Sequence, residues 1–415
     1  MSSYTIKYKY FALIFVGVLL VAGCSKKEDT INGPSANDEP GTASIDLANT
    51  QQVIRGFGAA NILPWRPDMT VDQINTAFGT GTGQLGFTIL RLRIPPDTSE
   101  FSLQVATAQL AYELGVKIIA SPWTPPASMK TNNDIVGGEL KTNSYAAYAA
   151  HLKSFADFML SKGVPLYAVS VQNEPDVTVT YESCDWTATQ MVNFVKNNAP
   201  SIGVKIIADE SMNFSHTITD AILNDPAAAA NLSIVGGHPY GVVNLTNYPL
   251  AMSKGKEVWS TEYLDLDTSW THVLATGKQI NDCMIAGMNA YIWWYIVRYY
   301  GPIREDGIVM KRGYVMSQFA RFIRSGYTRV GATANPQTNV YLTAYTNGTK
   351  FVIVVVNYAS SIEQAFSIRN GGAMTLTPYV TSSMKNCEQQ SDISYKNGTF
   401  AYTLEPSSVT TFVSK

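Results

Sequence analysis

The sequence predicts an α/β protein in which a (β/α)8 TIM barrel carries a β-sandwich side domain built from both chain ends. From about Gly56 to Ser325, short apolar and β-branched runs alternate with longer amphipathic ones, as in βα units around a parallel sheet. Eight such units in about 270 residues match the size of a closed barrel. After Tyr327 the apolar residues recur with a period of two, which indicates an all-β module.

Eight apolar runs are the candidate strands of the barrel. They are Gly56–Ala60, Thr88–Ile94, Lys117–Ser121, Tyr167–Gln172, Val204–Ala208, Ser233–His238, Lys256–Thr261 and Ala290–Tyr295. Helix-length segments separate them, such as Ser144–Ser161, where apolar residues recur at helical spacing. An open, doubly wound sheet shows the same alternation, but it usually carries a glycine-rich phosphate loop after its first strand, and this sequence has none there.

The side domain is predicted from strand-like runs at both ends of the chain. Asn347-Gly348 and Asn397-Gly398 are hairpin signals between such runs near the C-terminus. Ala43–Val53 is also typical of a strand and precedes the barrel. We therefore predict a β-sandwich from residues 45–54 and 326–415, and a barrel over residues 55–325.

Residues 1–24 predict a lipoprotein signal peptide. Two lysines precede an apolar run over residues 11–21, which has the length of a signal-peptide core and is short for a bilayer span. The run ends in a segment, residues 20–24, that resembles the bacterial lipoprotein box, in which Cys24 is lipidated and becomes the first residue. The alternative is a secretory leader with an incidental cysteine.

Residues 25–44 are polar and rich in Pro and Gly, as in a flexible linker. Leader and linker together predict a membrane-anchored lipoprotein outside the cytoplasm, either periplasmic or on the cell surface.

Composition limits the classes of partner. The net charge is −2 and the sequence pI is about 6.1, so no positive field draws nucleic acid. Aromatic residues make up 11% of the chain, and flat aromatic rings stack on sugar rings.

Three further cysteines, Cys184, Cys283 and Cys387, lack the spacing of a zinc site or a disulfide framework. One disulfide bond between two of them is left open.

Two glutamates stand where a barrel of this kind places its catalytic groups, at the C-terminal ends of strands. Glu174 follows the fourth candidate strand within Asn173-Glu174-Pro175, and Glu262 follows the seventh. These strands lie across the barrel from one another, so the two carboxyls are expected to face each other. Glycoside cleavage requires such a pair, and a gap of ~5–5.5 Å makes the reaction retaining.

At these residues the sequence resembles the retaining (β/α)8 glycosidases, and finer motifs are similar to those of glycoside hydrolase family 30. The motifs are Gly56-Phe57-Gly58-Ala59, Ser121-Pro122-Trp123-Thr124-Pro125-Pro126 and Gly237-His238-Pro239-Tyr240-Gly241. Residues 293–314 look like the eighth strand and loop of the family's bacterial glucuronoxylan-specific xylanases. The resemblance covers nearly the whole chain after about residue 45.

The resemblance implies a general acid/base at Glu174 and a nucleophile at Glu262. It also implies that Arg298 pairs with the carboxylate of a methylglucuronic acid branch on xylan, for which a planar guanidinium is suited. Tyr295 and Tyr300 are implied contacts of the same sugar acid. Val297, Tyr299 and a short loop after Glu262 depart from the family pattern and leave the strictness of glucuronate dependence open.

The remaining site residues are expected to support these two groups. Asn173 is expected to donate to the sugar 2-hydroxyl, and Tyr240 to hydrogen-bond the nucleophile. Arg93, which ends the second strand, is expected either to keep Glu262 ionised or to serve the framework. Trp123 and Trp293 are expected to offer stacking faces for xylose rings. This chemistry requires no metal and no organic cofactor.

The sequence therefore predicts a retaining endo-β-1,4-xylanase that hydrolyses glucuronic-acid-branched xylan. Its predicted partners are this polysaccharide and, through the lipid anchor only, a membrane; the chain is predicted to be monomeric. One alternative is another retaining β-glycanase of the family, acting on unbranched xylan, galactan or glucan. The other is a lipid-anchored glycan-binding protein without turnover, against which the two facing carboxyls argue.

Overall fold

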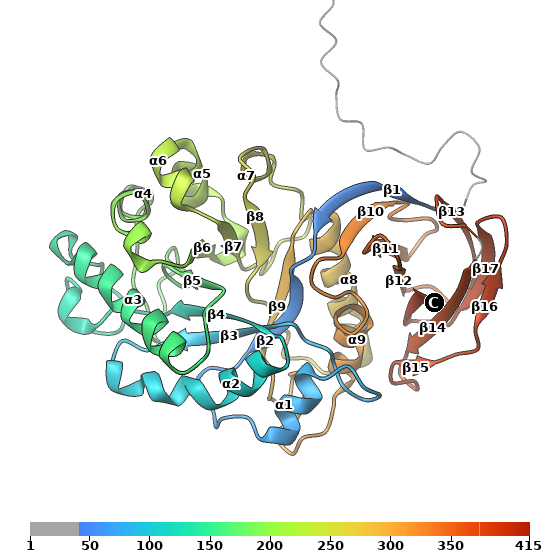
Figure 1. Ribbon diagram of the computed structural model, residues 1–415, viewed down its shortest axis with the longest axis horizontal. Helices are drawn as coiled ribbons and strands as arrows, with labels where there is room; N and C mark the ends of the chain where they lie inside the picture. Colours follow the sequence, from blue (N-terminus) through green and yellow to red (C-terminus); the bar gives the residue numbers. More distant parts are fainter. Residues whose placement is uncertain (1–40, 373) are drawn as a thin grey trace, which may run out of the picture.

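The computed structural model describes residues 41–372 and 374–415 (Figure 1). The predicted signal peptide, the lipidation site Cys24 and most of the linker lie outside the described residues. Eight parallel strands form a closed barrel. They are β2 (Gly56–Ala60), β3 (Ile89–Ile94), β4 (Lys117–Pro122), β5 (Ala168–Ser170), β6 (Lys205–Ser211), β7 (Ile234–Gly237), β8 (Glu257–Ser260) and β9 (Ala290–Tyr295).

All eight predicted barrel strands are present, and the differences lie at strand ends. The barrel closes because β2 pairs in parallel with β3 on one side and with β9 on the other. Helices surround it (Figure 1). They are α1 (Val71–Phe78), α2 (Val105–Glu113), α3 (Tyr145–Ser161), α4 (Ala188–Asn197), α5 (Thr217–Asn224), α6 (Pro226–Asn231), α7 (Pro249–Ser253), α8 (Trp270–Ile285) and α9 (Lys311–Ala320).

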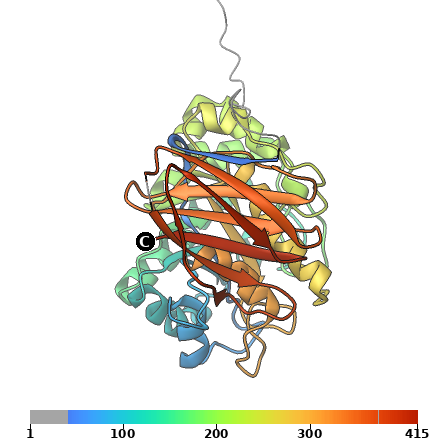
Figure 2. The same ribbon diagram turned by 90° about the vertical axis from the view of Figure 1, so that its right-hand side faces the viewer.

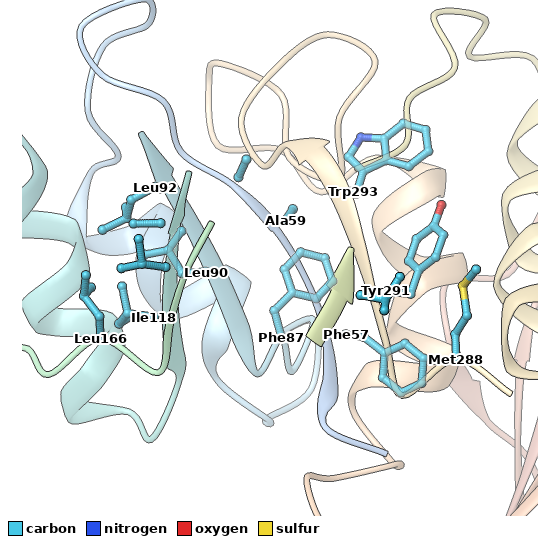
Figure 3. Packing of buried hydrophobic residues seen from close by; sticks show 14 of the residues in the cluster. Phe57, Ala59, Phe87, Leu90, Leu92, Ile118, Leu166, Met288, Tyr291 and Trp293 are labelled. Atoms are coloured by element: carbon cyan, nitrogen blue, oxygen red, sulfur yellow. The ribbon is translucent and has the colours of Figure 1, made fainter. Parts of the chain in front are cut away.

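Alternate residues of most barrel strands enter two different cores. Ile89, Ala290 and Ile292 belong to a small cluster inside the barrel. Their neighbours, such as Leu90 and Tyr291, belong to the larger layer between strands and helices, part of which is shown in Figure 3. Side chains of a strand alternate between faces, so this parity also decides which residues near a strand end can face the barrel mouth.

The side domain is one mixed sheet of ten strands from both chain ends. Its strands are β1 (Ala43–Val53), β10 (Thr328–Ala332), β11 (Val340–Thr346), β12 (Phe351–Asn357), β13 (Ile362–Arg369), β14 (Met374–Thr381), β15 (Glu388–Gln389), β16 (Ile393–Tyr395), β17 (Thr399–Leu404) and β18 (Ser408–Ser414). Strand β1 pairs antiparallel to β10 and parallel to β13. Nearly all the strands contribute to one shared core, so the sheet folds over on itself.

Helices α8 and α9 join the barrel to the side sheet and lie between the two in Figure 1. Figure 2 looks onto the side sheet, with the barrel behind it. The indole nitrogen of Trp270 donates to the Ser407 carbonyl at 2.9 Å. The Thr411 hydroxyl donates to the Gln318 carbonyl at 2.9 Å. The barrel and the side domain are therefore fixed to each other through buried contacts as well as through the chain.

Two further features bear on the predictions. Cys184, Cys283 and Cys387 are buried and unbridged, so the disulfide left open by the sequence does not form among them. None of the described helices combines the length and apolar character that crossing a bilayer requires.

Candidate active site

A cavity of about 490 Å³ opens at the C-terminal end of the barrel strands. Its position follows from the fold, because the loops after parallel strands gather at one end of the barrel. Both predicted carboxyls line it, together with aromatic side chains on which a sugar ring can stack. The lining residues are Trp65, Trp123, Asn173, Glu174, Tyr181, Glu262, Leu264 and Trp294.

The structure brings Glu174 and Glu262 together across the barrel mouth. One carboxylate oxygen of Glu174 lies within 4.8 Å of one carboxylate oxygen of Glu262, and both residues are buried, with 7% of their surface exposed. This spacing has no room for a water molecule between the carboxyl groups and a sugar, which an inverting mechanism requires. The geometry therefore fits a nucleophile that attacks the sugar directly.

Glu262 is held by one donor on each of its oxygens. The guanidinium of Arg91 donates to Oε2 at 2.6 Å, and the hydroxyl of Tyr240 donates to Oε1 at 2.9 Å. Burial alone would lower the pKa of Arg91, but Glu210 and Glu262 raise it, so the guanidinium keeps its charge. These two donors fix the orientation of the Glu262 carboxylate, as a nucleophile that attacks one sugar carbon requires. The expected hydrogen bond from Tyr240 is present.

The arginine beside Glu262 is Arg91 and not Arg93, so that part of the prediction was wrong. Arg93 forms ion pairs with Glu182 at 2.6 Å and Glu100 at 2.8 Å. Both arginines have the same parity on β3, but Arg93 lies one pleat further along and reaches the loops above the mouth. Arg93 therefore serves the framework, the other role that the sequence allowed for it.

Glu174 is held by a partner that can itself carry a proton. His238 Nδ1 lies 2.9 Å from Oε1, and the Tyr181 hydroxyl donates to Oε2 at 3.0 Å. Burial alone would raise the pKa of Glu174, but His238 and Tyr181 lower it below its ordinary value. Burial alone would lower the pKa of His238, but the charges of Glu262 and Glu174 raise it. The pair can therefore hold a proton at 2.9 Å from the Glu174 carboxylate, next to the group that acts as acid and base.

Asn173 is oriented by the same guanidinium that binds Glu262. Arg91 Nη2 donates to Asn173 Oδ1 at 2.7 Å. Because the amide oxygen accepts from Arg91, the amide nitrogen is the group that Asn173 offers to the cavity, as a donor to a sugar hydroxyl requires. Glu210 completes the group with an ion pair to Arg91 at 3.2 Å.

Glu174 and Glu210 also share a backbone feature. Both adopt positive φ, 45° and 52°, which is uncommon for residues other than glycine. The amide of Glu174 donates to the carbonyl of Glu210 at 3.2 Å. Such conformations gather at functional sites, where the surrounding structure enforces them.

The tryptophan of β9 that faces the cavity is Trp294, and the prediction for Trp293 was wrong. Trp293 is fully buried in the outer layer (Figure 3). The guanidinium carbon of Arg312 lies 4.5 Å from the centre of its ring. Trp294 shares the parity of Ala290 and Ile292, which point into the barrel. Trp123 lines the cavity as predicted.

Tyr295 is the last residue of β9, and Arg298 and Tyr300 lie in the segment that follows it. Both tyrosines are buried, at 9% and 6% exposure, while the Arg298 side chain is 31% exposed. Burial raises the pKa of Tyr300 to about 12, so its hydroxyl stays protonated and can donate. Arg298 is paired with Glu305 at 3.0 Å, a contact that the sequence did not predict.

Glu174, His238 and Glu262 are also the described residues whose ligand-type atoms come close enough to consider a metal ion. Both oxygens of each carboxylate already accept hydrogen bonds from Arg91, Tyr240, His238 or Tyr181. The contacts explain this trio as a hydrogen-bonded pair of reacting carboxyls.

Sequence reasoning missed Arg91, Tyr181 and Trp294, and it assigned no role to Glu210. The sequence of β9 is apolar at every position, so it does not show that Trp294, and not Trp293, faces the cavity. Tyr181 lies in a loop without periodicity, and its approach to Glu174 depends on the loop's path.

Comparisons with known proteins agree with this geometry. The model of the glycosyl hydrolase family 30 TIM-barrel domain matches residues 87–251. The glucuronoxylanase XynC of Bacillus subtilis (strain 168) is 41% identical over 413 residues, which cover 95% of this chain and 97% of that protein.

Two solved structures are similar over the same extent. The glycoside hydrolase family 30 subfamily 8 xylanase Xyn30A of Clostridium acetobutylicum matches with a TM-score of 0.85 at 40% identity, over 90% of this chain and 100% of that one. A GH30 endoxylanase from Clostridium papyrosolvens C71 matches with a TM-score of 0.84 at 40% identity and the same coverage.

The contact between Glu174 and His238 predicts how stability depends on pH. The lowered pKa of Glu174 adds stability above its ordinary value of 4.5, and this is lost as the pH falls through the folded value. The raised pKa of His238 adds stability below 6.5, and this is lost as the pH rises through the folded value. We expect the unfolding free energy of the wild type to exceed that of Glu174→Gln most between pH 4.5 and 6.5. Urea titrations from pH 3 to 9 measure this difference, and a difference independent of pH would contradict it.

Proposed function

Because the chain belongs to glycosyl hydrolase family 30, we propose that it is a retaining endo-β-1,4-xylanase that cleaves glucuronic-acid-branched xylan. The observation that carries the proposal is the pair Glu174 and Glu262, whose nearest oxygens lie within 4.8 Å over an aromatic-lined cavity. The relative at 41% identity is named a glucuronoxylanase, and the two solved structures are xylanases.

The reaction proceeds in two displacements. In the first, Glu262 attacks the anomeric carbon while Glu174 gives its proton to the leaving glycosidic oxygen, so a glycosyl ester forms and the C–O bond of the chain breaks. In the second, Glu174 takes a proton from water, whose oxygen attacks the anomeric carbon and releases Glu262. The sugar therefore keeps its anomeric configuration, and both carboxyls return to their starting states.

The neighbours of each carboxyl support this division of roles. Arg91 keeps its charge and donates to Glu262 at 2.6 Å, so it holds the nucleophile in place for the first displacement. His238 can exchange a proton with Glu174, which must be protonated in one step and ionised in the next. Asn173, fixed by Arg91, donates to the 2-hydroxyl, an interaction that strengthens in the oxocarbenium-like transition state.

Arg298 supplies the preference for acidic branches. Its guanidinium is reached by solvent and lies beside the hydroxyl of Tyr300, so it can pair with the carboxylate of a glucuronic acid side group. A neutral xylan chain has no group that uses this charge.

We further propose that the chain acts as a monomer tethered to a membrane outside the cytoplasm by a lipid on Cys24. Support comes from the apolar run over residues 11–21 and the polar linker that follows Cys24. A tethered enzyme of this kind acts on polysaccharide near the cell that makes it.

Glu262→Gln tests the nucleophile. We expect kcat on glucuronoxylan to fall by about 10⁴-fold or more, since an amide cannot form the glycosyl ester. Glu257→Gln is the matched control, because Glu257 lies at the start of the same strand, where it pairs with Arg55. Proton NMR of the first wild-type product should show retained configuration. Turnover by Glu262→Gln, or an inverted product, would contradict the mechanism.

Arg298→Ala tests the branch contact. We expect kcat/KM on glucuronoxylan to fall by about tenfold or more relative to linear xylohexaose, because a charge-assisted pair is lost. Arg304→Ala is the control, since Arg304 lies on the same loop and pairs with Asp306. Equal losses on both substrates would remove Arg298 from branch recognition.

Cys24→Ser tests the anchor. We expect the wild-type chain in the membrane fraction and the variant in the soluble fraction, because the lipid and its attachment site are removed. Labelling with a radioactive fatty acid should mark only the wild type. An unlabelled wild-type chain would contradict the lipoprotein assignment.

A further inference from the structure

Arg298, the proposed partner of the acidic branch, already forms an ion pair with a carboxylate of the protein, that of Glu305. Arg298 Nη1 donates to Glu305 Oε1 at 3.0 Å, and the same oxygen lies 3.9 Å from Nη2 of Arg66. Arg66 follows Trp65, which lines the catalytic cavity, and its guanidinium carbon lies 6.0 Å from the centre of the Tyr295 ring. Glu305 is therefore shared by two arginines at the edge of the cavity.

These three side chains can exchange partners without moving the backbone. Glu305 is 49% exposed, and Arg298 and Arg66 are 31% and 30% exposed, so water screens the pair and keeps it weak. The loop itself is fixed: the amide of Gly307 donates to the Arg304 carbonyl at 2.9 Å, and Gln73 donates to the Glu305 carbonyl at 3.2 Å. Only the Glu305 side chain has to rotate.

Counting charges shows what an acidic branch requires here. The two positive charges of Arg66 and Arg298 face the single negative charge of Glu305, so one more negative charge would balance them. If a uronate forms an ion pair with Arg298, then Glu305 stays paired only if its side chain rotates toward Arg66. Without Arg66, two carboxylates would compete for one guanidinium, and like charges at this distance repel.

We propose that Glu305 is a placeholder for the uronate on Arg298, and that Arg66 accepts it when the substrate binds. Arg66 and Glu305 are thus specificity-determining residues for acidic branches. Glu305 weakens the affinity for the branch, and Arg66 limits that effect. The inference rests on the proposed function, which assigns the acidic branch to Arg298.

The same turn offers a matched control. Asp306 follows Glu305 directly and is 50% exposed, but it pairs with Arg304, with Oδ1 2.9 Å from Nε. Removing its charge changes the net charge of the loop by the same amount, without touching Arg298 or Arg66. A general charge effect and a specific exchange can therefore be separated.

The test is calorimetric binding by full-length protein carrying Glu262→Gln, which removes turnover. The probes are a xylooligosaccharide with one methylglucuronate branch and the unbranched oligomer of the same length. We expect Glu305→Gln to tighten branched binding by about two- to fivefold, and Arg66→Ala to weaken it by a similar factor. In the Glu305→Gln background, Arg66→Ala should have little further effect. Asp306→Asn should bind like the parent, and added salt should shrink the differences.

Other results would overturn the inference. Weaker branched binding in Glu305→Gln would show that Glu305 positions Arg298 instead of competing for it. An equal effect of Arg66→Ala on both oligomers would remove Arg66 from branch recognition. A parent that prefers the branched oligomer, with affinity unchanged in Glu305→Gln, refutes the placeholder and leaves the proposed function standing. A parent without this preference refutes the assignment of Arg298, and the inference with it.

Discussion

The buried guanidinium of Arg91 is the contact on which the rest of the site depends. It donates to Ser121 on β4, to Asn173 after β5 and to Glu262 after β8, and it pairs with Glu210 on β6. A cation with no exposed surface is tolerated only when anions and acceptors satisfy it, and here they come from four walls of the barrel. The guanidinium of Arg91 therefore also fixes the positions of Glu262, Asn173 and Glu210 relative to one another.

The two carboxyls differ in role because their partners differ in chemistry. Glu262 has a partner that never titrates, and Glu174 has one that does. The two glutamates are equally buried, so their different roles come from their hydrogen-bond partners, Arg91 for Glu262 and His238 for Glu174. Arg66 and Arg298 at the cavity edge are reached by solvent. Their ion pairs with Glu305 are therefore weaker, and partners can be exchanged there.

Much of the fold could be predicted because β-branched runs of strand length are rare outside strands. The two glutamates could be placed because a barrel gathers its loops at one end. Arg91 and Trp294 could not, because barrel strands are buried on both faces and their sequences do not show which face a residue takes. The sequence also does not show how far along β3 the barrel mouth lies, so the arginine that reaches Glu262 was predicted to be Arg93 when it is Arg91. Contacts made by loops, such as Tyr181 with Glu174, depend on a path that no periodicity records.

Strand β1 has a consequence for how the chain is made. Its partners belong to the far end of the sequence: Ser44 bonds to Thr333, 289 positions later. While the chain leaves the ribosome, β1 has no neighbour until β10 emerges, although every strand of the barrel has already appeared. The sheet is therefore completed last, and an interrupted chain exposes an unpaired edge that favours aggregation. The side domain can therefore form only after β10 and β13 are available to pair with β1.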